Sequence, residues 1–338
     1  MTPAASPDLS VVIASYNARA TISECLESLQ RQRTSRPFEI ILVDSGTDGT
    51  GSLVEQRFPE VRLLRSRTRR YCGDARNTGI SEAKGDIVAF LDADCTAHED
   101  WVDRVLRAHA SHHGAVGGSI LNGEPCNAVG WAAYFLEFSE WMPATPRGTK
   151  EDVAGANMSY DIGLLKQTGP FIEGTYCSDT EFHWRMVAGG NFIRFDPSIR
   201  VTHRGIDTWP IYLRHEFFHG SCFARVRSRR LGRGLRTLHA LGLPLLPAVL
   251  LFRIASRNVR NPVYLGNFIR SLPALVPGLM SWSLGESFGY LSKEGRRGSR
   301  SRPRPRRAEQ SKTRRGPWLH ARSEQAGPRR SRSDPAEP

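Results

Sequence analysis

The sequence predicts an α/β fold built around a mostly parallel sheet. Residues 9–15, 38–43 and 87–91 are short apolar runs rich in β-branched side chains, the pattern of buried strands. Helical spacing of apolar residues follows the first two runs, over 20–32 and 52–58. Alternating strands and helices at this spacing predict parallel strands joined by right-handed crossovers.

Further elements follow the same reasoning along the rest of the chain. A helix is expected to open within YCGDARNTGI and to lead into strand 87–91. The segment 117–147 carries no readable pattern and is expected to form loops that set acceptor choice. The other expected elements are a strand at 61–64, a helix at 101–112, a strand entered from 151–160, a helix starting at Asp179, and a strand pair at 192–195 and 199–203.

Two aspartates, Asp92 and Asp94, come directly after strand 87–91. Ligands of open α/β sheets collect at the carboxyl ends of the strands. Alternation along an extended backbone points both carboxylates the same way, where they repel each other and lose hydration. A bound divalent cation would relieve that conflict. Taken alone, the D-x-D pattern describes a solvated turn equally well.

Two other polar residues occupy positions suited to a nucleotide. Asp44 ends strand 38–43 and is placed like an acidic residue that binds a ribose hydroxyl, although a helix cap is an equal alternative. Arg76 lies near a predicted helix start, where its forked guanidinium would match the oxygens of a diphosphate.

The order of four motifs, VVIASYNA, ILVDSGTDGT, GDARNTGI and FLDADC, resembles the nucleotide-sugar-binding half of family 2 glycosyltransferases of the inverting GT-A type. The resemblance covers roughly Leu9 to Gly205. One departure is visible, because the second motif is one residue shorter than the usual V-D-D/S-G-S-T-D-G-T. The expected fold is therefore the GT-A nucleotide-diphospho-sugar transferase fold.

The resemblance implies a donor site at the predicted sheet edge. It implies that Ala14, Tyr16 and Asp44 border the nucleoside, and that Arg76 and Asp92 lie near the nucleotide. The implied donor is a nucleotide-sugar, and a UDP-sugar is favoured.

The resemblance also implies that Asp94 binds a metal that bridges the diphosphate. Mg²⁺ or Mn²⁺ is the expected ion, since both prefer oxygen ligands and commonly bind through one or two carboxylates plus substrate phosphates. His203 ends the last predicted strand and is a candidate metal ligand or diphosphate contact, with a loop histidine as the alternative.

The expected acceptor side lies further along the chain. Gly155 and Asn157 belong to a segment that lies under the acceptor in the resembling family, although an ordinary turn is the alternative. Asp179 matches the general base, but Ser178 replaces the acidic residue that usually precedes it. One carboxylate suffices for inverting transfer, since only the acceptor hydroxyl must lose a proton. Without the other motifs, Asp179 would be interpreted as a helix N-cap.

The composition changes after residue 208. Two uncharged runs, 237–252 and 271–285, would each make a helix of about 22–24 Å, shorter than the ~30 Å hydrocarbon core of a membrane. Prolines interrupt both runs, and arginines precede the first. We expect re-entrant or interfacial helices at the cytoplasmic face of the cell membrane, with arginines against anionic headgroups. Buried helices of a helical appendage are the alternative.

The net charge of +13 is concentrated at the C-terminus. Residues 293–338 carry 15 Lys and Arg against 5 Asp and Glu, so that the preceding part is nearly neutral. This tail is rich in Arg, Ser, Pro and Gly and is predicted to be disordered. It lacks the interleaved aromatic residues of a stacking platform, so that nucleic acid is not an expected partner.

The histidines and cysteines outside these motifs give less information about function. His98, His109, His112 and His113 lie on a polar segment without an obvious acidic partner and are expected on the solvated surface. The six cysteines show no C-x-x-C spacing, and the first ten residues lack the features of a secretory signal. Reduced thiols in a cytosolic setting are the simplest interpretation.

These observations predict a flexible start at 1–8, a catalytic domain at 9–208, a helical membrane-associated region at 209–292 and a tail at 293–338. The expected activity is metal-dependent, inverting transfer of a sugar to an acceptor hydroxyl, on a lipid-linked or cell-envelope glycan. A non-catalytic nucleotide-sugar-binding scaffold is one alternative. A sugar-phosphate nucleotidyltransferase is another, but ASYNARA lacks the Gly-rich basic loop that it would need.

Overall fold

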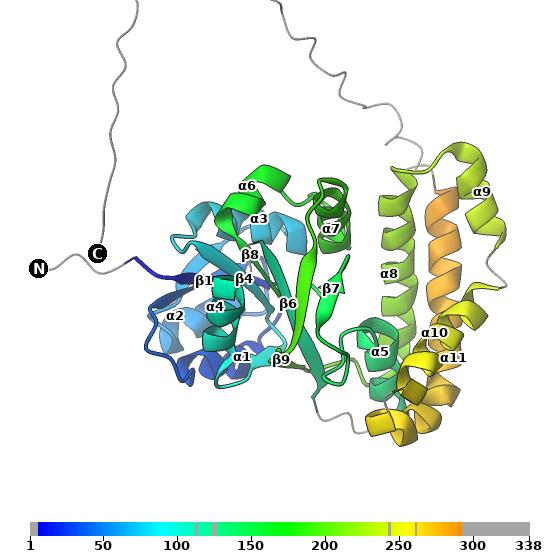
Figure 1. Ribbon diagram of the computed structural model, residues 1–338, viewed down its shortest axis with the longest axis horizontal. Coiled ribbons are helices and arrows are strands. Elements are labelled where there is room, and N and C mark those ends of the chain that lie inside the picture. Colours follow the sequence, from blue (N-terminus) through cyan, green and yellow to red (C-terminus); the bar gives the residue numbers. More distant parts are fainter. Residues whose placement is uncertain (1–5, 112–113, 124–126, 243–244, 261, 293–338) are drawn as a thin grey trace, which may run out of the picture. The chain divides into compact units, whose positions relative to one another are not determined.

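A computed structural model describes residues 6–111, 114–123, 127–242, 245–260 and 262–292. One nine-stranded sheet, in the order β3-β2-β1-β4-β8-β6-β9-β5 with β7 paired to β9, is flanked by helices (Figure 1). The predicted tail at 293–338 and residues 1–5 lie outside the described residues.

The N-terminal half of the sheet is parallel, as the alternation of strands and helices predicts. The apolar side chains of its central strand are buried on both faces, which is typical of a parallel sheet covered by helices on both sides. The strands are β1 (Leu9–Ser15), β2 (Phe38–Asp44), β3 (Arg62–Arg65) and β4 (Ile87–Asp92), and the connecting helices are α1 (Ile22–Gln30), α2 (Thr50–Arg57) and α3 (Cys72–Glu82).

The second half of the sheet is mixed, so that the prediction of a mostly parallel sheet is wrong there. Four strand pairs of the sheet are parallel and four are antiparallel. Only β6 and β9 pair in parallel in this half. The apolar pattern of a strand indicates that it is buried, but not which strand it pairs with. In this half of the sheet, no regular strand–helix–strand alternation indicates whether neighbouring strands run in parallel. The strands are β5 (Cys95–Ala97), β6 (Ala115–Asn122), β7 (Gly148–Lys150), β8 (Asn157–Asp161) and β9 (Ile193–His203).

The segment expected to be loops, 117–147, contains regular structure. The end of β6 and all of α5 (Ala128–Phe138) fall within it. β6 was not recognised because two glycines interrupt its β-branched pattern. α5 was not recognised because its residues are apolar on nearly all faces, so that the sequence shows no helical period. The remaining helices of this part are α4 (Trp101–Ser111), α6 (Ile162–Thr168) and α7 (Ser178–Ala188).

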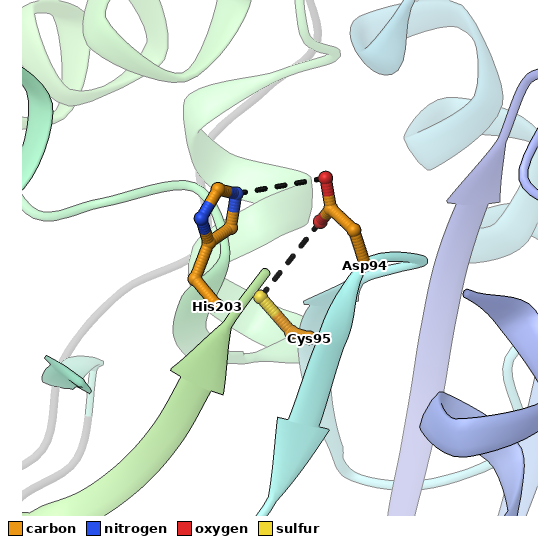
Figure 2. Close-up of side chains that lie close together, drawn as sticks. All are labelled: Asp94, Cys95 and His203. Carbon is orange, nitrogen blue, oxygen red and sulfur yellow. Dashed lines mark hydrogen bonds and ion pairs between the residues drawn. The ribbon is translucent and has the colours of Figure 1, made fainter. Parts of the chain in front are cut away.

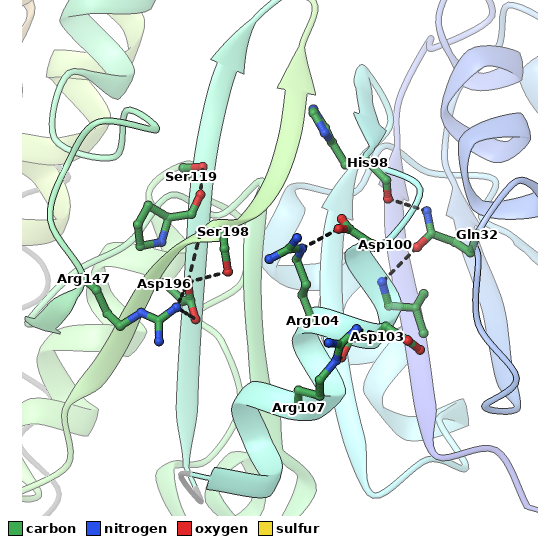
Figure 3. A network of polar contacts seen from close by, with 12 residues as sticks. Gln32, His98, Asp100, Asp103, Arg104, Arg107, Ser119, Arg147, Asp196 and Ser198 are labelled. Atoms are coloured by element: carbon green, nitrogen blue, oxygen red, sulfur yellow. Dashed lines mark hydrogen bonds and ion pairs between the residues drawn. The ribbon is translucent and has the colours of Figure 1, made fainter.

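The predicted strand pair at 192–195 and 199–203 is one strand, β9, with an irregularity. Its register with β6 shifts between Gly118 and Ser119. Asp196 occupies the irregular stretch and accepts hydrogen bonds from the backbone N–H (3.0 Å) and hydroxyl (2.7 Å) of Ser198. Arg147 forms an ion pair with the same carboxylate at 2.9 Å (Figure 3).

One histidine prediction is wrong. His109 is buried, and its ring contacts Ser159 Oγ at 2.9 Å and Asp161 Oδ1 at 3.1 Å. The partners that the local sequence lacks come from β8. Because Ser159 is itself buried, we interpret the Ser–His–Asp arrangement as structural. His112 and His113 lie outside the described residues.

The C-terminal helices α8 (Trp209–Ser228) and α11 (Leu265–Leu291) pack along each other, and α5 packs against α11 (Figure 1). Glycine makes the close approach possible. A Cβ on Gly220 would lie 2.3 Å from Trp282 O, and one on Gly285 would lie 2.0 Å from Phe217 O.

The prolines predicted to interrupt the second uncharged run do not end its helix, since Pro273 and Pro277 lie inside α11. The long contact with α8 stabilises the helix across the missing N–H groups. The first run falls on α9 (Arg233–Leu241) and α10 (Leu246–Arg260), and a 3₁₀ turn (Pro262–Tyr264) follows. Over the described ranges, no single helix has the length and hydropathy of a membrane span; residues 234–241 and 246–260, bent by 73°, meet that criterion only as a pair.

Asp196→Asn tests the β9 irregularity. Burial opposes ionisation, but the Ser198 hydrogen bonds and Arg147 hold the pKa of Asp196 below its usual value of 3.8. The stabilisation is therefore present above about pH 4 and lost as pH falls through the lowered pKa. We expect the substitution to lower the free energy of unfolding by about 1–2 kcal/mol at pH 7 and by less near pH 3.5, measured by urea titration.

The control for this substitution is Asp100→Asn, which removes the exposed pair of Asp100 with Arg104 (Figure 3). A surface pair of this kind contributes little, so that a loss below about 0.5 kcal/mol is expected. Equal losses for both variants, or a loss at Asp196 that does not change with pH, would contradict the account.

Candidate active site

The carboxyl ends of three parallel strands meet at the candidate site. Ala14 of β1 lies in register with Asp92 at the end of β4, and Ser15 lies in register with Asp44 at the end of β2. Ser15 Oγ donates a hydrogen bond to the Asp44 carboxylate at 3.0 Å. The sheet therefore brings Ala14, Asp44 and Asp92 to one edge.

Arg76 of α3 joins three segments that are distant in the sequence. Its guanidinium lies 3.4 Å from Asp92 Oδ1 and 3.9 Å from Asp179 Oδ2, and it donates a hydrogen bond to Gly155 O at 3.1 Å. The side chain is only 4% exposed. Burial alone would lower the pKa of Arg76, but the charges of Asp179 and Asp92 raise it, so that the residue stays a cation.

The D-x-D turn holds its two carboxylates in different electrostatic environments. Burial and the neighbouring Asp94 raise the pKa of Asp92 to about 6, although Arg76 acts in the opposite direction. Burial also opposes ionisation of Asp94, but the charge and hydrogen bond of His203 lower the pKa of Asp94 below its usual value. Asp94 is thus the more strongly ionised of the two carboxylates.

His203, the last residue of β9, faces Asp94. Its Nε2 lies 3.5 Å from Asp94 Oδ2 (Figure 2). Burial alone would lower the pKa of His203, but Asp94 raises it to about 9. Asp94, Cys95 and His203 offer ligand atoms within 4.8 Å of one another. A carboxylate oxygen and an imidazole nitrogen fit a divalent cation such as Mn²⁺, with substrate oxygens and water as further ligands.

Asp179 is the second residue of α7, in agreement with the predicted helix start. The preceding turn positions it: Cys177 has φ 59°, a left-handed conformation that residues other than glycine rarely adopt. Ser178 then fits against α3, where a Cβ on Gly73 would lie 2.9 Å from its Cβ. Glu181, two residues later, is an ion-pair partner of Arg185 at 2.8 Å.

Of the two acceptor-side candidates, only Gly155 joins this cluster. A Cβ at Gly155 would lie 2.3 Å from Asp179 Oδ2 and 2.7 Å from the Arg76 guanidinium, so that the approach of both depends on a residue without a side chain.

Asn157 lies in the core instead. It accepts a hydrogen bond from Trp101 Nε1 at 2.9 Å and donates to Ser119 O and Ile199 O, both at 3.0 Å. Its amide is therefore saturated, and this placement does not favour the predicted contact with an acceptor.

Two cavities meet at the D-x-D turn. One of about 410 Å³ contains the groups around Arg76, and the other, of about 460 Å³, lies over the start of the first crossover. Tyr16 lines the second cavity and has the Arg69 guanidinium 4.4 Å from its ring centroid. The first is lined by Arg76, Asp92, Asp94, Gly155, Asp179 and His203, and the second by Ala14, Tyr16, Asp92 and Asp94, among others.

The sequence analysis missed a second group of polar side chains in the first cavity. Glu137 of α5 lies beside His215 of α8, with 2.9 Å between Oε1 and Nε2, and His219 lies one turn further along α8. Burial opposes ionisation of Glu137, but His215 lowers its pKa to about 2, whereas burial lowers the pKa of His219 to about 4. The spacing of the two histidines, four residues apart on a helix, is the signal that could have identified them.

Comparison with solved structures identifies the fold class. The mannosyltransferase PcManGT from Pyrobaculum calidifontis, solved in complex with GDP-Man and Mn²⁺, superposes with a TM-score of 0.57. The match covers 84% of this chain and 88% of that one at 19% sequence identity. The fold is that of the GT-A glycosyltransferases.

Comparison of sequences finds the same class of protein. Residues 10–165 match the family described as Glycosyl transferase family 2. Glycosyltransferase AglE of Haloferax volcanii is 29% identical over 190 residues, which cover 53% of this chain and 60% of the relative. The succinoglycan biosynthesis protein ExoO of Rhizobium meliloti is 36% identical over 107 residues, 31% of each chain. The chain thus spans less than two thirds of the length of these relatives.

Gly155→Ala tests the cluster around Arg76. The added methyl group is expected to displace Asp179 from Arg76 without disturbing the core, because both neighbours are ends of side chains. We expect nucleotide release from a nucleotide-sugar donor to fall at least about tenfold, with the melting temperature lowered by less than about 4 °C. The matched control is Gly163→Ala, where a Cβ meets nothing within 4 Å. Equal activities in the two variants would show that the space at Gly155 is unimportant.

Proposed function

We propose that the chain is an inverting glycosyltransferase that moves a sugar from a nucleotide-sugar, a UDP-sugar in the first instance, to an acceptor hydroxyl. The carrying observation is the buried Arg76, which contacts Asp92 and Asp179 in the first cavity, while Asp92 also lines the second cavity. This arrangement matches what the reaction needs, since donor and acceptor must meet at one sugar carbon.

The cavity beside Tyr16 suits the nucleoside. Ala14 and Tyr16 line it, and Asp44 lies at the neighbouring strand end, as a carboxylate that accepts ribose hydroxyls would. Arg70 and Arg204 also line this cavity and supply positive charge for a diphosphate. Arg204 is tied to the D-x-D turn, because its backbone N–H donates to Asp94 O at 2.9 Å.

Asp94 and His203 would hold Mg²⁺ or Mn²⁺ next to that diphosphate. When bound, the ion supplies Lewis-acid stabilisation of the charge that develops on the leaving group. The donor set supports this assignment, since Asp94 and His203 face each other across 3.5 Å with an oxygen and a nitrogen ligand. Asp92 lies 3.4 Å from the Arg76 guanidinium and would orient it.

Asp179 would act as the base. Inverting transfer needs one group that accepts the proton of the acceptor hydroxyl while the hydroxyl oxygen attacks the anomeric carbon. Asp179 lines the first cavity together with Asp92 and Asp94, and its Oδ2 lies 3.9 Å from the Arg76 guanidinium. The missing side chain of Gly155 lets this carboxylate approach Arg76, which would hold the base in place.

We further propose that the protein works on the cytoplasmic face of the cell membrane, on a lipid-linked or cell-envelope acceptor. The support is a large set of exposed apolar side chains on and between the C-terminal helices, with the exposed arginines Arg253 and Arg260 among them. Exposed apolar patches of this extent mark interaction surfaces. The residues are Leu235, Leu238, Leu241, Leu245, Val249, Phe252, Val259, Val263, Ile269, Met280, Leu284, Phe288 and Leu291.

A panel of UDP-, GDP- and dTDP-sugars with Mg²⁺ or Mn²⁺ tests the catalytic proposal. We expect Asp179→Asn to bind donor normally and to lose at least about 100-fold in kcat, because only the base is removed. Asp94→Asn should instead weaken metal-dependent donor binding, measured by calorimetry. Glu181→Gln, on the same helix but ion-paired with Arg185, is the control and should retain activity. Full turnover by the Asp179 variant would favour a non-catalytic scaffold.

Sedimentation with vesicles tests the membrane proposal. Phe252→Glu places a charge at a side chain that is 74% exposed on α10, and we expect at least about tenfold weaker binding to vesicles that contain anionic lipid. Phe192→Glu is the control, because Phe192 is also exposed (48%) but precedes β9. Equal effects of both substitutions, or no binding by the unaltered chain, would contradict the proposal.

A further inference from the structure

The segment His215 to His219 reads HEFFH and lies within α8. Two histidines four residues apart lie on the same face of a helix, one turn from each other. Glu137 of α5 faces them from a separate helix. These three residues offer one nitrogen or oxygen atom each within 4.8 Å of one another. We propose that Glu137, His215 and His219 hold a second divalent cation of the zinc type, distinct from the ion at Asp94 and His203.

Unsatisfied polar atoms support a ligand at this place. His219 Nδ1 has no hydrogen-bond partner among the described residues, whereas His215 Nε2 lies 2.9 Å from Glu137 Oε1. Glu216, between the histidines in sequence, is 0% exposed; no N–H or O–H group of the described chain donates to its carboxylate, which lies beside the carboxylate of Glu137. Buried polar atoms without partners are uncommon, and a bound ion is one explanation for them.

Aromatic rings fix the orientation of the histidines. The His219 ring is 4.6 Å from Trp282 and 5.0 Å from Tyr176, both nearly edge to face. Tyr176 also contacts His215, at 6.1 Å between centroids. Rings held in this way lose little freedom when a metal binds, which favours a site that exists before the ion arrives.

The ligand types indicate the kind of metal. Two imidazoles and one carboxylate are a frequent zinc set, with a fourth position left to water or substrate. Mg²⁺ and Ca²⁺ prefer oxygen ligands and suit this set less well. The set thus differs from that at Asp94, where one carboxylate and one imidazole would share the ion with phosphate oxygens.

The pattern H-E-x-x-H is also typical of zinc hydrolases, in which the glutamate activates a water. Here His215 and His219 line the 410 Å³ cavity, but Glu216 is not part of its lining. The glutamate is therefore not placed to act on a water in the cavity, and the site binds an ion without the general base of a hydrolase. The fourth position of the ion would face the cavity that also contains Asp179.

Metal binding by the full-length chain, stripped with a chelator and then titrated with Zn²⁺ or Co²⁺, tests this site. In an Asp94→Asn background, which weakens the other site, we expect one Co²⁺ per chain with the visible absorption of a four-coordinate ion. His215→Gln in that background should weaken binding at least about 100-fold. The control is His239→Gln, since that ring stacks on Tyr290 in α11, away from the cluster.

Glu137→Gln is the second variant, and circular dichroism checks that each variant is folded. Loss of Co²⁺ binding in either folded variant supports the site. Unchanged binding in both, or no binding by the Asp94→Asn protein, overturns the site and leaves a simple ion pair between Glu137 and His215. Because the readout is metal content and absorption, its failure is separate from failure of sugar transfer.

Discussion

One buried guanidinium determines the arrangement of the site. Arg76 is almost without solvent contact, so that its charge requires carboxylates and carbonyl oxygens as compensation. Asp92, Asp179 and Gly155 O provide them from the end of β4, the start of α7 and the loop before β8. Removal of either carboxylate leaves a buried charge with fewer partners. The same contacts that compensate this charge therefore also set the distance between Asp92 and Asp179.

The C-terminal helices belong to this arrangement and are not only an appendage. α8 supplies His215 and His219, and α11 supplies Trp282, all of which line the same cavity as Asp94 and Asp179. Arg257 of α10 reaches the rim and pairs with Glu140 at 2.6 Å. The exposed apolar side chains lie on the remaining faces of these helices. Under the membrane proposal, the bound surface would thus lie next to helices that also line the cavity of Asp94 and Asp179.

The sequence predicted the parts that are encoded locally. β1, β2 and β4 are apolar runs, and the D-x-D turn follows from where β4 ends. It could not predict partners that come from distant segments: His109 with Asp161, Asn157 with Trp101, or Glu137 with His215, the last pair 78 residues apart. The periodicity of apolar residues indicates which side chains are buried, but not which segments pair with one another. The sequence analysis therefore missed the mixed half of the sheet and the second group of polar side chains. The spacing of His215 and His219 could be recognised in the sequence, but their proximity to Glu137 could not.

The central claim is that donor and base meet across Arg76. A crystal structure of the Asp179→Asn protein with Mn²⁺ and an intact nucleotide-sugar tests it most directly, since we expect this substitution to slow turnover. The account predicts the nucleoside beside Ala14 and Tyr16, the diphosphate beside Asp94 and His203, and the side chain at position 179 facing the anomeric carbon. A nucleotide bound elsewhere, or a side chain at position 179 on the other side of the sheet from that carbon, would contradict it.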